Sequence, residues 1–134
     1  MITAYTDGGA RGNPGPAGYG VVIADEQEQV LAELKGALGH ATNNVAEYEG
    51  LLAALRYAVD HGHARLRVRS DSLLMVQQMK GVYRVKHPGL QPLHNEAQRL
   101  VTRLERVQFE HVPRRDNARA DALANEAMDE VQRG

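Results

Sequence analysis

The chain has 134 residues, a length that fits one domain folded around its own core, and it contains no cysteine. The absence of cysteine excludes disulfides, thiolate metal ligands and thiol nucleophiles, so oxygen or imidazole groups must hold any metal ion. The net charge of -1 hides an asymmetry, because residues 65–115 carry eleven lysines and arginines against four acidic residues. Such an excess is typical of a solvated surface, but it also suits a phosphate-binding face.

No apolar stretch approaches the roughly 20 residues that a membrane span requires, and no basic and apolar leader precedes the first strand-like segment. No internal repeat, linker or low-complexity segment divides the chain. We therefore expect one domain over residues 1–134 in a soluble, cytoplasmic protein with no membrane contact.

The first half of the sequence predicts three strands and a helix. Residues 2–7, 19–24 and 29–38 have the composition of strands, and the short links between them favour an antiparallel meander. Thr42-Asn43-Asn44 then predicts a helix start, and Gly62 a natural end.

The second half alternates strands with helices. Residues 65–70 alternate basic and apolar side chains, as a strand does, and a short helix through Lys80 follows. A helix over 90–106, a strand over 107–112 and a last helix capped by Asp116-Asn117 complete the chain. The order βββαβααβα predicts an α/β fold, a five-stranded mixed sheet flanked by helices.

Four acidic residues stand out by their placement. Asp7 and Asp71 each follow a strand, whereas Glu47 and Asp121 lie in the first turns of helices beside apolar positions. Strand ends and helix starts can meet at one edge of a sheet, and clustered carboxylates would need divalent cations. Oxygen ligands favour Mg²⁺ or Mn²⁺, and two such ions about 4 Å apart suit phosphodiester hydrolysis. Helix capping and the helix dipole explain any one of these acids alone.

Glycine is frequent directly after Asp7, at positions 8, 9, 12, 15, 18 and 20. Glycine lets a ligand approach the backbone closely, because no Cβ stands in the way. The segment matches neither the phosphate loop of nucleotide-binding proteins nor the dinucleotide fingerprint. It therefore predicts the close approach of a bulky substrate rather than a nucleotide pocket.

Four blocks of sequence combine these signals. They are Tyr5–Gly9 with Gly12–Gly15 and Gly18–Gly20, then Thr42–Glu47, then Ser70–Ser72, and finally Asn117–Asn125. In this order they closely resemble the type 1 branch of the ribonuclease H family, over almost the whole chain. The resemblance implies the ribonuclease H-like fold and an endoribonuclease that cuts the RNA strand of RNA/DNA hybrids. It implies a two-metal-ion mechanism with Mg²⁺, for which Mn²⁺ substitutes, leaving 5′-phosphate and 3′-hydroxyl ends.

The resemblance also implies roles for individual residues. Asp7, Glu47, Asp71 and Asp121 fall at the family's catalytic, metal-binding acids, with Asp7 bridging both ions and Asp121 holding one of them. The implied substrate contacts are Gly8, Gly9, Asn13, Thr42, Asn43, Asn44, Arg114 and Arg115. Groups near the glycines and asparagines would read the 2′-hydroxyl of RNA across a wide minor groove, although helix capping is the favoured explanation for at least one of the two asparagines. The arginines would contact phosphates, as would Arg84, Lys86 and His87.

Two departures from the family's pattern limit this comparison. Residues 72–106 are too few for the long basic helix and loop of many type 1 enzymes, and residues 112–117 lack the histidine usual before the last helix. His111 is expected inside a strand with a structural role, so Arg114 or Arg115 would replace that histidine. These features resemble the compact archaeal-like bacterial members, which adds double-stranded RNA as a candidate substrate. We expect a monomer without an obligatory protein partner.

Two other functions compete with this interpretation. One is a module of the same fold that grips hybrid duplexes and is catalytically weak, which the four intact acids disfavour. The other is a different nuclease of the wider fold, a 3′ exonuclease or a strand-transfer enzyme, which the glycine segment and the Asn43-Asn44 pair disfavour.

Overall fold

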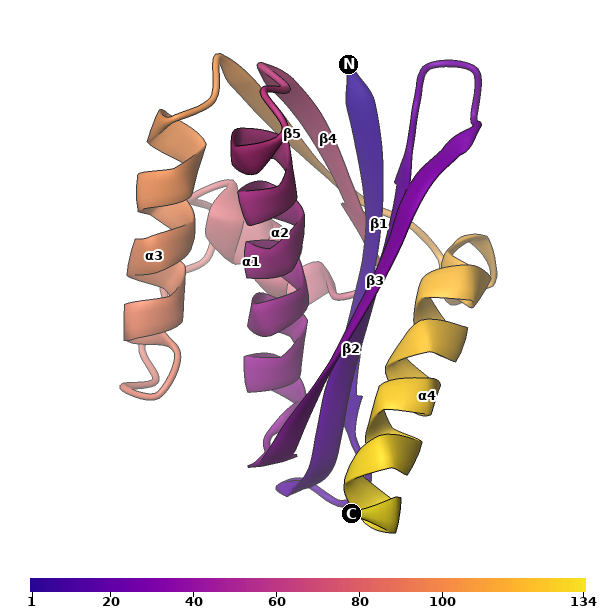
Figure 1. Cartoon of the computed structure of the whole chain (residues 1–134). Helices are drawn as coiled ribbons and strands as arrows, with labels where there is room; N and C mark the ends of the chain where they lie inside the picture. The colour runs from indigo at the N-terminus through magenta and orange to yellow at the C-terminus, as the bar shows by residue number, and fades with distance from the viewer.

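One five-stranded sheet runs through the molecule in the order β3-β2-β1-β4-β5 (Figure 1). The computed structural model describes all residues from Met1 to Gly134. The strands are β1 (Ile2–Ala10), β2 (Gly15–Ala24), β3 (Val30–Ala41), β4 (Arg65–Ser70) and β5 (Arg106–His111). The first three pair antiparallel, and β4 pairs parallel with both β1 and β5. The expected mixed sheet is confirmed.

The helices cover both faces of this sheet. Figure 1 shows α1 (Asn43–Asp60) and α3 (Gln91–Thr102) on one side and α4 (Ala118–Arg133) on the other. The short α2 (Leu73–Met79) follows β4, and a 3-10 turn, η1 (Arg114–Asn117), leads into α4. No helix has the length and apolar character to cross a membrane.

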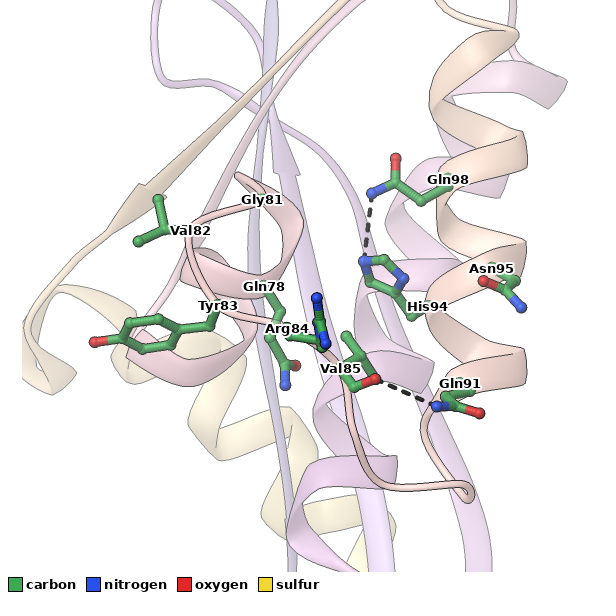
Figure 2. A pocket seen from close by; sticks show the side chains of 10 residues that line it. All are labelled: Gln78, Gly81, Val82, Tyr83, Arg84, Val85, Gln91, His94, Asn95 and Gln98. Atoms are coloured by element: carbon green, nitrogen blue, oxygen red, sulfur yellow. Dashed lines mark hydrogen bonds between the residues drawn. The ribbon is translucent and has the colours of Figure 1, made fainter.

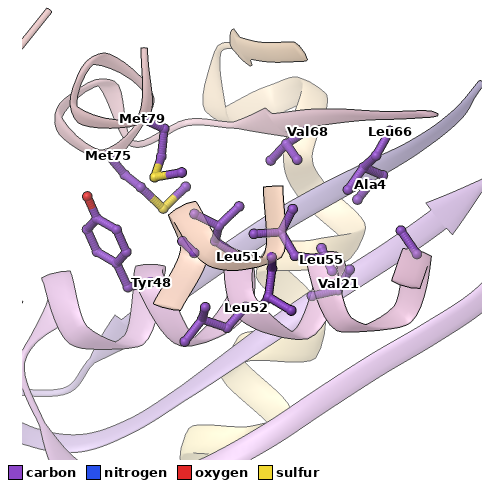
Figure 3. Close-up of a cluster of buried hydrophobic side chains, with 14 of the residues drawn as sticks. Ala4, Val21, Tyr48, Leu51, Leu52, Leu55, Leu66, Val68, Met75 and Met79 are labelled. Atoms are coloured by element: carbon purple, nitrogen blue, oxygen red, sulfur yellow. The ribbon is translucent and has the colours of Figure 1, made fainter. Parts of the chain in front are cut away.

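The larger core lies between α1 and the sheet (Figure 3). Leu51, Leu52 and Leu55 recur at helical spacing on α1 and pack with residues of the sheet such as Leu66 and Val68. Each of these side chains is 1% exposed or less, so each contributes roughly 2 kcal/mol of hydrophobic stabilisation. This core fixes α1 against the middle of the sheet.

On the opposite face, glycines in β2 let α4 approach the strand backbone. A Cβ on Gly20 would lie 2.3 Å from the carbonyl oxygen of Ala120, and one on Gly18 would lie 2.5 Å from the Cβ of Ala127. These two glycines therefore serve helix packing. The interpretation of the whole glycine segment as a substrate-approach surface is wrong for them.

The boundaries of several elements differ from expectation. β1 continues through the glycines to Ala10, because Gly8 and Gly9 pair with Tyr19 and Gly18 of β2. Asp7 therefore lies inside a strand, opposite Gly20, and not at its end. α3 stops at Thr102, and Arg106 already belongs to β5.

The two expected helix caps have different outcomes. Thr42 is the N-cap of α1, where its Oγ1 accepts a hydrogen bond from the Val45 backbone N–H at 3.2 Å. The expected side-chain cap of α4 is wrong, because the Asn117 side chain makes no capping bond. Its Nδ2 instead donates to the carbonyl oxygen of Thr6 at 2.8 Å, a buried bond that ties the start of α4 to β1 beside Asp7.

The arginines of β4 are largely paired within the protein. Arg65 contacts Glu105 at 2.8 Å and Arg69 contacts Glu110 at 2.9 Å, while the alternate residues Leu66 and Val68 are buried. The alternation predicted from the sequence is confirmed. Both acidic partners belong to residues 65–115, so these ion pairs leave the net basic excess of that segment unchanged.

Candidate active site

Three carboxylates meet at one end of the central strands. Asp7 comes from β1, Glu47 from the first turns of α1, and Asp71 follows the last residue of β4. The parallel register pairs Thr6 with Ser70, so the next residues on both strands, Asp7 and Asp71, emerge side by side. One oxygen from each of the three carboxylates lies within 4.8 Å of the others.

Asp121 faces the same place from α4. All four expected acids line one open depression of about 430 Å³. Asn125, one turn further along α4, donates to the Asp121 carboxylate at 3.3 Å and to its backbone carbonyl at 2.9 Å. The fold therefore brings together residues that are up to 114 positions apart in the sequence.

No buried positive charge compensates the carboxylate cluster. Burial, followed by the charges of Asp71 and Asp121, raises the pKa of Asp7 from 3.8 to about 8. Burial, followed by the charges of Asp7 and Asp71, raises the pKa of Glu47 well above its ordinary value. Glu47 Oε1 is buried without a hydrogen-bond partner. An all-oxygen cluster with an orphaned oxygen fits a hard divalent cation.

These pKa shifts predict how the metal-free protein responds to pH. The pKa of Asp7 is higher in the folded protein than the ordinary value of 3.8, so the protonated side chain favours the folded state. This contribution to the free energy of unfolding is complete below pH 3.8 and is lost as the pH rises through about 8. Asn cannot ionise, so Asp7→Asn in a chelator should melt at least about 5 °C above the wild type at mildly alkaline pH. Thermal melts across the pH range test this. Excess Mg²⁺ should raise the melting temperature of the wild type more than that of the variant, and a variant less stable than the wild type throughout would contradict the expectation.

Several expected substrate contacts form the walls of the depression. Gly8, Gly9, Asn43, Asn44 and Arg114 all line it. Asn43 is held in place, because its Oδ1 accepts from the Ala10 backbone N–H at 2.7 Å. Its amide nitrogen stays available to a ligand.

Three other expected contacts lie outside the lining. Asn13 Oδ1 accepts a hydrogen bond from the Asn43 backbone N–H at 3.0 Å, and the Thr42 hydroxyl caps α1. Both contacts fix the start of α1, where Asn43 lies. Arg115 is exposed on η1. Substrate contact by these three residues stays a prediction.

The lining also includes residues that the sequence analysis did not name as candidate site residues. They are Ala10, Arg11, Ser72, Asn125 and Met128. Ser72 caps α2, where its Oγ accepts a hydrogen bond from the Met75 backbone N–H at 3.3 Å. Two features of the sequence could have pointed to these residues. Asn125 follows Asp121 at the i, i+4 spacing of one helix face, and Ser72 is adjacent to Asp71.

Arg114 and His111 both lie close to Asp71. Arg114 Nε is 3.7 Å from Asp71 Oδ2, and its side chain is 86% exposed. His111 is the last residue of β5, and its Nε2 lies 3.3 Å from the Asp71 backbone carbonyl oxygen. Arg114 is thus the loop cation beside the carboxylates, while His111 contacts the backbone next to them.

Comparison with known proteins identifies the family. A family model described as reverse transcriptase-like matches residues 5–127. The ribonuclease H of Dinoroseobacter shibae is 37% identical over 146 residues, which cover 95% of this chain and 90% of that protein. The chain belongs to the ribonuclease H family.

Further relatives place this ribonuclease H family member in the type 1 branch. The bifunctional protein Rv2228c of Mycobacterium tuberculosis is 54% identical over 129 residues, or 96% of this chain, but the chain spans only 35% of that protein's length. The solved structure of LC11-RNase H1 in complex with an RNA/DNA hybrid has a TM-score of 0.94 and 47% identity, covering 98% of this chain and 99% of that one. The expected family and ribonuclease H-like fold are confirmed.

Proposed function

We propose that the chain is an endoribonuclease that hydrolyses the RNA strand of RNA/DNA hybrids. The observation that carries this proposal is the meeting of Asp7, Glu47 and Asp71 within 4.8 Å, with Asp121 lining the same depression. LC11-RNase H1, with nearly the same fold, has been solved with such a hybrid. The products would carry 5′-phosphate and 3′-hydroxyl ends.

The residues present fit a two-ion site occupied by Mg²⁺, with Mn²⁺ as a substitute. Asp7 would serve both ions, Glu47 and Asp71 one of them, and Asp121 the other. When bound, the ions neutralise the charge that develops on the phosphate and polarise it for attack by water. Four carboxylates in a partly buried site would otherwise repel both one another and the substrate phosphate.

The walls of the depression favour RNA over DNA. The 2′-hydroxyl both donates and accepts hydrogen bonds, so it can pair with backbone groups at Gly8 and Gly9 and with side-chain amides. The Asn43 amide suits this role, because its orientation is fixed by the Ala10 N–H. Asn44 is exposed at the same rim.

Arg114 would hold a substrate phosphate next to the carboxylates. Its guanidinium is mostly exposed yet lies near Asp71, so it can swing toward a phosphate without breaking a buried contact. Arg115 would contribute a second, more distant contact. Arg114 would also stand in for the histidine that the short loop lacks.

Side-by-side cleavage of RNA/DNA, RNA/RNA and DNA/DNA duplexes with Mg²⁺ and Mn²⁺ tests this function. We expect metal-dependent internal cuts in the RNA strand of the hybrid and no cutting of DNA/DNA. Cutting of RNA/RNA would establish double-stranded RNA as an additional substrate. A label on internal ribonucleotides separates endonuclease from exonuclease activity, and hybrid binding without product after long incubation in Mn²⁺ would favour a binding module instead.

We further propose that residues 1–134 act as one monomeric domain without an obligatory protein partner. The two helical layers pack on one continuous sheet, and all four acids come from this chain. Sedimentation of the active protein at its own mass tests the monomer. The cytoplasmic location stays a prediction.

A further inference from the structure

A second depression, of about 600 Å³, opens between α2 and α3, away from the carboxylates (Figure 2). Its lining comes from the end of α2, the segment 81–85 and one side of α3. The polar side chains of the lining are four amides, one arginine, one histidine and one tyrosine, and none of the lining residues is acidic. A pocket lined in this way favours an anionic ligand.

Gln78 provides a rigid hydrogen-bond donor in this pocket. It is only 5% exposed, and its Oε1 accepts a hydrogen bond from the Tyr48 hydroxyl at 2.7 Å. Burial raises the pKa of Tyr48, so this hydroxyl stays protonated and keeps donating. The amide is thereby oriented, and its Nε2 is left free to donate to a ligand.

His94 provides a second donor from α3. Its ring packs edge-on against Tyr48, with the ring centroids 6.3 Å apart. The Gln98 side-chain nitrogen lies 3.3 Å from His94 Nε2 (Figure 2). When that ring nitrogen accepts from Gln98, a neutral ring carries its proton on Nδ1, where it can serve a ligand.

Arg84 supplies the positive charge. Its side chain is exposed and forms no ion pair, unlike the arginines of β4. Figure 2 shows the Arg84 guanidinium between Gln78 and His94, whereas Tyr83 points away from them. A guanidinium flanked by neutral donors, with no competing carboxylate, matches the acceptor pattern of a phosphate group.

We propose that this pocket binds a phosphate group of a nucleic acid or nucleotide through Arg84, Gln78 and His94. Two sources fit this chemistry. One is a backbone phosphate of the duplex, because the seven residues of α2 place Gln78 only about 10 Å along the helix from Ser72 of the carboxylate depression. This first source rests on the proposed function. The other source is a free nucleotide, which does not depend on it.

Two measurements distinguish the sources, and neither requires cleavage. Hybrid binding is measured in an Asp7→Asn background, with and without Arg84→Ala. Titration of the wild type and of Arg84→Ala with inorganic phosphate and with a 5′-mononucleotide is followed through the backbone amide signals of residues 81–91. Arg103→Ala is the matched control, because Arg103 is also exposed and follows the far end of α3, outside the pocket.

If the ligand is a backbone phosphate, Arg84→Ala should weaken hybrid binding about five-fold. The slope of the logarithm of the binding constant against the logarithm of the salt concentration should also become shallower by about one, and Arg103→Ala should change neither quantity. For a free nucleotide, the amide shifts should saturate in the wild type and disappear in Arg84→Ala while hybrid binding is unchanged. Either result supports the pocket. The proposal is overturned when Arg84→Ala equals Arg103→Ala in both measurements, and that result would leave the cleavage activity intact.

Discussion

Replacing Asp7 with Asn should reduce hybrid cleavage about 10³-fold or more while leaving the fold intact. The substitution keeps the size of the side chain but removes the charge that lies within 4.8 Å of Glu47 and Asp71. It therefore removes a ligand proposed to serve both ions, and electrostatic groups at reacting centres contribute effects of this size. Initial rates with saturating Mg²⁺ and Mn²⁺ measure the loss.

A measurement of hybrid binding distinguishes a loss of catalysis from a loss of substrate affinity. Asp7→Asn adds no negative charge to a polyanion-binding surface, so the dissociation constant should stay equal or fall. Asp60→Asn is the matched control, since Asp60 is an exposed residue at the end of α1, remote from the depression. An active Asp7→Asn variant, or an equally inactive Asp60→Asn variant, would refute the proposed two-ion site.

Gly8→Ala should be the most damaging small substitution in the depression. A Cβ on Gly8 would lie 2.3 Å from the Ala46 carbonyl carbon and 2.6 Å from the Glu47 backbone nitrogen. These are backbone atoms of α1, so relief requires the helix to move off β1. We expect a loss of about 3 kcal/mol in the free energy of unfolding, measured by urea denaturation.

The neighbouring glycine provides the control for this substitution. A Cβ on Gly9 would meet the Met128 Cε at 3.6 Å and the Asn43 Oδ1 at 3.7 Å, which are ordinary contact distances. Gly9→Ala should therefore unfold near the wild-type denaturant concentration. Cleavage by Gly8→Ala should also fall at temperatures where it remains folded, because a displaced α1 moves Glu47 away from Asp7. Equal stabilities of the two variants would show that α1 does not pack as closely on β1 as the structure indicates.

Local sequence signals predicted the element types well and their limits less well. Alternation in Arg65–Ser70 and helical spacing after Thr42 report burial against neighbours, so both elements appear where expected. Strand pairing across the glycines could not be anticipated, because glycine alone favours a turn and only the partner β2 makes β1 continue to Ala10. The Asn117 side chain similarly leaves its capping role for a bond to Thr6, a residue 111 positions away.

From the sequence alone, the resemblance of four motif blocks predicted the family and the four acids, and local periodicity predicted the order of strands and helices. Only the tertiary structure decided which groups share a site. The parallel register of β1 and β4 sets Asp7 beside Asp71, and α1 and α4 pack onto β1 and β2 closely enough, through Gly8 and Gly20, to add Glu47 and Asp121. The tertiary structure also placed Arg114 beside the carboxylates and Arg84 in the separate pocket between α2 and α3. Such distances depend on long-range packing, which no short stretch of sequence encodes.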